Sequence, residues 1–183
     1  MGKSMRCNTV ARKEDKAILE MTNKIGLMTY MALYDVFGFK EKRIRKFYDA
    51  MMALKSDWSE DVVPTDAMLR YCEKKKIDVY HRMKSIPTSK KLMLVGKNTV
   101  PGVINYLEAG FLVNILMSVI VLKEEFRFTN PQIETYLDKI EYYIDSFTRK
   151  QPKTNKFYLT SEMILEIFRD EMHLDLNTGE KVV

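Results

Sequence analysis

Residues 33–47 read LYDVFGFKEKRIRKF, and residues 122–136 read LKEEFRFTNPQIETY. Five apolar positions of the first stretch recur in the second at a constant spacing of 89 positions: Leu33, Phe37, Phe39, Ile44 and Phe47 correspond to Leu122, Phe126, Phe128, Ile133 and Tyr136. In each stretch a helical pattern stops at a Phe-X-Phe turn and resumes directly after it. The sequence therefore predicts that a unit of helix, sharp turn and helix occurs twice in the chain.

The two turns differ at their central residue. Gly38 is typical of a helix end, because glycine adopts the left-handed conformation that closes a helix. Arg127 stands at the corresponding position of the second turn, and Thr129-Asn130-Pro131 then supplies a cap followed by a first-turn proline. We expect a shared apolar skeleton with different surfaces, and any functional face among the residues that differ rather than among the shared phenylalanines.

Composition favours a helical protein of the cytoplasm. The 183 residues are 46% hydrophobic and 30% charged, and only five prolines and seven glycines interrupt them. Alternating strand patterns are scarce, so the chain is predicted to be mainly α. Cys7 and Cys72 are the only cysteines, which is typical of a reducing compartment. The N-terminus has no apolar region of the kind that a secretory signal requires.

The predicted fold is all-α, with two degenerate helix-turn-helix-like repeats of three helices packed into one helical body. The segments are a flexible N-terminal tail (1–11), a basic repeat (12–85), a linker (86–102), an acidic repeat (103–176) and a C-terminal tail (177–183). Within them we expect the first helix to begin near Arg12, and Leu92 to Val95 to form a short strand in the linker. The run from Val103 to Leu122 is long and apolar enough to cross a bilayer. Glu108, Asn105 and Asn114 within it favour a central core helix instead.

The charges are distributed unequally. Residues 1–100 hold 21 Lys/Arg against 12 Asp/Glu, a net charge of +9, whereas residues 101–183 hold 9 against 13, a net charge of −4. Such polarity bears on partners rather than on fold: the first half suits nucleic acid or an acidic surface, and the second half suits a basic surface. Two solvated faces would give the same counts.

Enzyme chemistry finds little support in the residues. Leu92 to Thr99 superficially resembles a phosphate-binding loop, but Lys91 stands at the earlier glycine position and Asn98 at the Ser/Thr position. His81 and His173 have no Cys, His or acidic partner at a metal-ligand spacing. The many carboxylates have the spacing of a solvated helix face. We expect no catalytic residues, no metal and no cofactor.

The basic residues of the second predicted helix support direct nucleic-acid binding better than the sequence supports an enzyme. The outline of short helices around a glycine turn is similar to that of a helix-turn-helix module. The nucleic-acid-binding candidates on this helix are Lys40, Lys42, Arg43, Arg45 and Lys46. Because no Asn, Gln or Ser accompanies them, we expect phosphate contacts rather than base reading. A phage regulatory protein that binds DNA is therefore the alternative function.

The string from Ala32 to Ile44, ALYDVFGFKEKRI, resembles a motif of short helical proteins from phages and prophages of low-GC Gram-positive bacteria. In those proteins a run like Ala-Leu-His-Asp-Glu-Phe-Gly-Phe-Gly precedes Lys/Arg-Arg and an amphipathic helix. Here Tyr34 replaces the histidine and Lys40 the last glycine, and the resemblance covers about Ala17 to Val79. It implies a phage-encoded interaction protein in the host cytoplasm, such as an anti-CRISPR inhibitor. Such an inhibitor would bind a Cas9-type nuclease with its guide RNA and block DNA binding or domain closure.

The acidic half offers one route to such a partner. Carboxylates there are expected to face the arginines and lysines with which a nuclease holds DNA. The candidate partner-binding residues are Glu134, Asp138, Glu141, Asp145, Glu162, Glu166 and Asp170. The basic half would instead contact guide RNA or an acidic domain. A structural or virion-assembly protein is the third class that the sequence allows.

Overall fold

Every regular element of the computed structural model, which describes residues 2–59, 65–95 and 104–172, is a helix. The helices are α1 (Gly2–Phe37), α2 (Glu41–Ser59), α3 (Thr65–Lys74), α4 (Val79–Ser85), α5 (Thr88–Met93), α6 (Ile104–Glu124), α7 (Asn130–Thr148) and α8 (Ser161–Met172). Apart from one isolated bridge between Lys150 and Phe157, the described residues contain no β structure. The predicted all-α class is confirmed.

The two predicted turns have the same backbone geometry. Gly38 has a φ of 62° and Arg127 a φ of 57°, both in the left-handed region. The N–H of the phenylalanine that follows donates to the carbonyl six positions earlier, at 3.0 Å in both turns: Phe39 to Leu33 and Phe128 to Leu122. After the second turn, Thr129 caps α7, as the sequence predicts, and the structure adds a capping box between Thr129 and Gln132. That the halves are copies of one unit stays a prediction; the turns themselves correspond.

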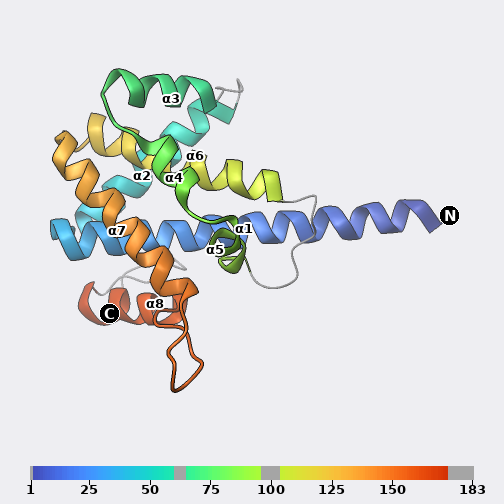
Figure 1. Cartoon of the computed structure of the whole chain (residues 1–183). Helices are drawn as coiled ribbons and strands as arrows, with labels where there is room; N and C mark the ends of the chain where they lie inside the picture. The colour runs from blue at the N-terminus through green and yellow to red at the C-terminus, as the bar shows by residue number, and fades with distance from the viewer. Residues whose placement is uncertain (1, 60–64, 96–103, 173–183) are drawn as a thin grey trace.

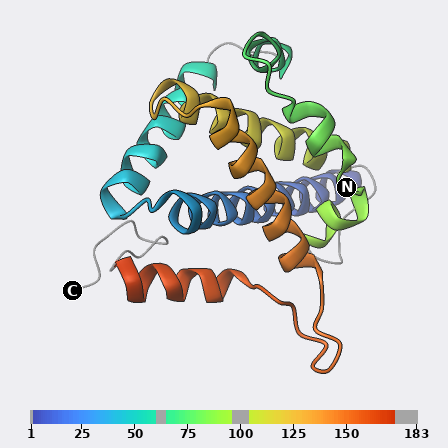
Figure 2. The same ribbon diagram turned by 60° about the vertical axis from the view of Figure 1, so that its left-hand side comes forward.

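The two halves interlock into one body (Figures 1 and 2). α1 packs against α6, α7 and α8, and α6 packs against α1, α2 and α3. Each long helix therefore contacts the second and third helices of the other half. The turns also meet, since the ring centroids of Phe37 and Phe128 are 4.7 Å apart and those of Phe39 and Phe126 are 5.0 Å apart. Buried side chains from both halves form a single core.

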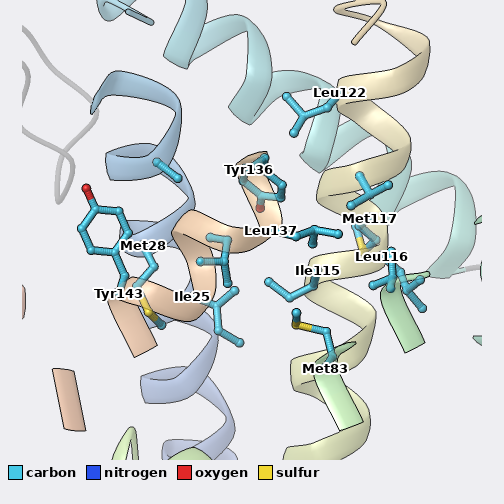
Figure 3. Close-up of a cluster of buried hydrophobic side chains, with 14 of the residues drawn as sticks. Ile25, Met28, Met83, Ile115, Leu116, Met117, Leu122, Tyr136, Leu137 and Tyr143 are labelled. Carbon is cyan, nitrogen blue, oxygen red and sulfur yellow. The ribbon is translucent and has the colours of Figure 1, made fainter. Parts of the chain in front are cut away.

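The core lies between α1, α6 and α7, where Figure 3 shows Ile25, Ile115 and Leu137 pointing toward one another. Tyr136 is fully buried among them, and its hydroxyl lies 3.1 Å from the hydroxyl of Thr29. α6 is long and apolar enough to cross a membrane. Every residue from 115 to 122 is buried, however, and α1, α2 and α3 pack against this helix. Its hydropathy is accounted for by its place in the core.

The expected start of the first helix near Arg12 is wrong, because α1 begins at Gly2 and includes residues 2–11 of the predicted tail. No proline interrupts α1, and a helix that is already nucleated extends at little cost. The first turns of α1 project beyond the other helices in Figure 1.

The predicted linker at residues 86–102 contains a helix and no strand in its described part. α5 includes Leu92 and Met93 of the expected strand, and the N–H groups of Lys90 and Lys91 donate to the carbonyl of Pro87. A proline with a φ of −56° directly before these residues favours a helix start. α4 is a further helix that the sequence did not predict; the Asp78 side chain caps it. Residues 96–102, residues 173–176 of the second repeat with His173, and the tail at 177–183 lie outside the described residues.

Candidate nucleic-acid interface

The basic residues of α2 form an exposed surface beside the first turn. We call Lys40, Lys42, Arg43 and Lys46 the basic face; all four side chains are exposed, whereas Arg45 is half-buried and 3.1 Å from Glu41. The turn at Gly38 points α2 away from α1, so that Lys40 directly precedes α2 and the other three residues lie in its first two turns. The N-terminus of a helix adds positive potential through its exposed N–H groups. The predicted basic residues are therefore together, except that Arg45 lies to one side.

Aromatic rings support the cations of the basic face. The guanidinium carbon of Arg43 lies 3.7 Å from the ring centroid of Phe39 and 5.8 Å from that of Phe126. The ammonium of Lys46 lies 5.2 Å from the same Phe126 centroid. Cations over rings are attracted by the ring quadrupole and lose rotamer freedom before any partner binds. The repeated phenylalanines Phe39 and Phe126 therefore support cations of the candidate face as well as packing in the core.

Few carboxylates compete for the basic face. Lys46 lies 3.7 Å from Glu125 across an exposed surface, which contributes little in water. Within the described ranges no carboxylate pairs with Lys40, Lys42 or Arg43. Lys40 instead lies 4.7 Å above the ring of Tyr34. The face therefore keeps most of its positive charge for an external anion.

The predicted acidic face differs from the basic face, because its carboxylates on α7 are paired with cations and its candidates are spread over two helices. Glu134, Asp138 and Glu141 all bind the guanidinium of Arg82 in α4, at 2.6, 2.5 and 2.7 Å. We call these four residues the Arg82 cluster. Arg82 keeps only 20% of its side-chain surface exposed. Burial opposes its charge, but the hydrogen bonds that it donates to Asp138 and Glu141 raise its pKa. The cluster holds α4 against α7 and retains a net charge of −2.

The remaining acidic candidates are separated from this cluster. Asp145 lies 2.8 Å from Lys90 of α5 and 3.4 Å from Arg149, and the hydrogen bond from Lys90 lowers the Asp145 pKa. The other three candidates, Glu162, Glu166 and Asp170, are exposed on α8. This helix packs against α1, and Figure 2 shows it apart from α7. The seven carboxylates therefore do not form one surface. The sequence pattern missed Arg82 because it lies 52 to 59 positions before its partners.

A hollow between α3 and α4 is the most enzyme-like feature, with a volume of about 470 Å³. Cys72, Asp78 and His81 line it, and the His81 Nδ1 is 2.9 Å from the Asp78 carboxylate. Burial raises the pKa of the Cys72 thiol to about 11, so little thiolate exists at neutral pH. Both members of the His81–Asp78 pair are exposed, and the pair lies at the start of α4 as part of its cap. The hollow lacks an activated nucleophile.

Comparison with protein-family models, with curated proteins and with solved structures finds no match to the chain. The interpretation of the basic face therefore depends on its residues and their geometry.

Proposed function

We propose that this protein is a non-enzymatic binding protein that holds a nucleic-acid phosphate backbone on the basic face of α2. We further propose that the nucleic acid is the guide RNA of a Cas9-type nuclease, which the protein inhibits by occupying its RNA and DNA surfaces. The observation that carries the proposal is the exposed guanidinium of Arg43, 3.7 Å above the ring of Phe39. Its position is fixed before binding, so less side-chain entropy is lost when a phosphate binds.

The composition of the basic face favours backbone contact. Lys and Arg bind phosphate through charge and hydrogen bonds, and such contacts position a protein without reading bases. Helical RNA is recognised mainly through its backbone and shape, because its major groove is too deep and narrow for side chains. The motif that resembles phage proteins, Ala32 to Ile44, overlaps this face and supports a host target.

A binding titration at two salt concentrations tests the proposal. Four phosphate contacts predict that affinity for guide RNA falls roughly a hundredfold between about 50 and about 200 mM salt. Reversing two charges, Lys42→Glu with Arg43→Glu, should weaken binding to guide RNA by about tenfold or more, because two phosphate contacts are lost and two repulsions are added. The matched control reverses two exposed lysines outside the face, Lys55→Glu with Lys74→Glu, and should bind nearly as wild type. Equal losses in the two variants would contradict a specific face.

Duplex DNA in the same titration distinguishes the proposed inhibitor from the alternative function, a phage regulatory protein that binds DNA. A phage regulatory protein would bind duplex DNA through the same four residues, with the same steep salt dependence. The inhibitor is expected to co-purify with the nuclease and its guide RNA. Tight binding to duplex DNA without association with the nuclease would establish the regulator and reject the inhibitor.

A further inference from the structure

The loop between α7 and α8 projects from the body as a narrow hairpin in both views (Figures 1 and 2). We call residues 149–158 the basic hairpin. They read RKQPKTNKFY, with four cations and no carboxylate. Nearly half of the nine Lys/Arg residues after position 100 are therefore in one loop of the otherwise acidic half.

Backbone hydrogen bonds hold the hairpin in a defined shape. The Gln151 N–H donates to the Lys156 carbonyl at 2.8 Å, and the Tyr158 N–H donates to the Arg149 carbonyl at 3.1 Å. At the tip, Asn155 has a φ of 55°, which asparagine adopts more readily than most residues. The backbone of the hairpin is therefore ordered before binding, so a partner does not have to order it.

Two cations at the start of the hairpin pair with the two aromatic rings at its end. The Arg149 guanidinium carbon lies 4.7 Å from the Tyr158 ring centroid, and the Lys150 ammonium lies 5.5 Å from the Phe157 ring centroid. The rings keep 41% and 37% of their surface exposed. Among the described residues, the one carboxylate paired with this hairpin is Asp145, 3.4 Å from Arg149. Exposed rings beside unpaired lysines are the combination with which proteins hold unpaired nucleotides.

We propose that the basic hairpin binds single-stranded nucleic acid. Lys150, Lys153 and Lys156 contact its phosphates, and the rings of Phe157 and Tyr158 stack on its bases. A duplex offers phosphates but keeps its bases paired and stacked, so only a single strand uses both kinds of group.

This site is separate from the basic face of α2. Phe126, which supports that face, precedes α7, whereas the hairpin follows α7. The helix between them has 19 residues and so spans about 28 Å. The proposal therefore does not rest on the proposed function, and separate variants test the two.

The test is fluorescence anisotropy of the full-length chain with labelled single strands of DNA and of RNA and with a mixed-sequence duplex. A charge variant replaces Lys150, Lys153 and Lys156 with alanine. A stacking variant combines Phe157→Leu with Tyr158→Leu. The matched control replaces three exposed lysines outside both sites, Lys16, Lys55 and Lys74, with alanine. Circular dichroism establishes that each variant is folded.

The wild type is expected to bind single strands, and comparison of DNA with RNA shows which is preferred. The charge variant should reduce the slope of log affinity against log salt by about 2, because each phosphate contact on a single strand contributes about 0.7. The stacking variant should weaken single-strand binding about tenfold or more while leaving duplex binding and the salt slope unchanged. The control variant should change the affinity for single strands and for the duplex by no more than about twofold.

Three outcomes would overturn the proposal. The first is a wild type that does not bind single strands, and the second is equal losses in the charge variant and the control. The third is hairpin-dependent binding to polyglutamate without binding to either oligonucleotide, which would assign the hairpin to an acidic protein. Reversal of Lys42 and Arg43 should leave the hairpin's contribution to single-strand affinity unchanged. The experiment therefore tests the hairpin independently of the proposal for the basic face of α2.

Discussion

Substitutions at the central residues of the two turns, Gly38 and Arg127, test most sharply whether the two turns share one left-handed backbone conformation. Gly38→Ala places a Cβ at a φ of 62°, where no atom lies within 4 Å of it, so the cost is conformational and not steric. The left-handed conformation costs a non-glycine residue about 1–2 kcal/mol. Lower entropy of the unfolded chain returns about 0.4–1 kcal/mol of this. We expect a net destabilisation of about 1 kcal/mol, or a Tm lower by about 2–4 °C.

Arg127→Gly makes the opposite kind of change, because it introduces glycine at the left-handed position of the second turn. It relieves a φ of 57° and removes a 3.8 Å pair with Glu124 whose arginine side chain is 82% exposed. A pair this exposed contributes little, so we expect stability to rise by up to about 1 kcal/mol. Urea denaturation followed by circular dichroism measures both variants. The reasoning is refuted if Arg127→Gly destabilises the protein as much as Gly38→Ala does.

Three further predictions concern contacts between helices. Arg82→Ala should destabilise the protein by about 1–2 kcal/mol in urea denaturation, with a smaller deficit at high salt because the three carboxylates left behind repel one another less; Lys84→Ala on the same helix is the control. Asp35 accepts a 2.5 Å bond from Lys139, which lowers its pKa. Because this carboxylate is more acidic in the native state, Asp35→Asn should lower Tm at neutral pH. That deficit should persist down to the ordinary carboxyl pKa of 3.8 and disappear as the pH falls through the lower native value; a pH-independent deficit would exclude this cause. Tyr136→Phe removes the buried hydroxyl that lies 3.1 Å from Thr29, and should cost about 0.5–1.5 kcal/mol; no loss in a urea titration would show that the bond contributes nothing.

Local signals in the sequence predicted the turns and the helix starts around them. Gly38 and the Thr129 cap depend on residues within six positions of one another, so their geometry follows from short-range rules. Lys40, Lys42 and Arg43 are exposed for an equally local reason, since the buried Ile44 and Phe47 occupy one side of α2 and leave the opposite side to solvent.

Long-range contacts explain what sequence reasoning did not predict. The helical spacing of Glu134, Asp138 and Glu141 correctly placed them on one face, but nothing local indicated that Arg82 covers it. Counting charge over whole halves also concealed the basic hairpin. Its signal was present as ten residues with four cations, no carboxylate and two adjacent aromatic residues.

Titration of a Cas9-type nuclease loaded with guide RNA tests the proposed function most directly. The wild-type protein is expected to co-elute with the loaded nuclease and to stop DNA cleavage at a stoichiometric ratio, and the Lys42→Glu, Arg43→Glu variant should do neither while remaining folded. Undiminished inhibition by that variant, or a wild-type protein that does not associate with the loaded nuclease, would contradict the account.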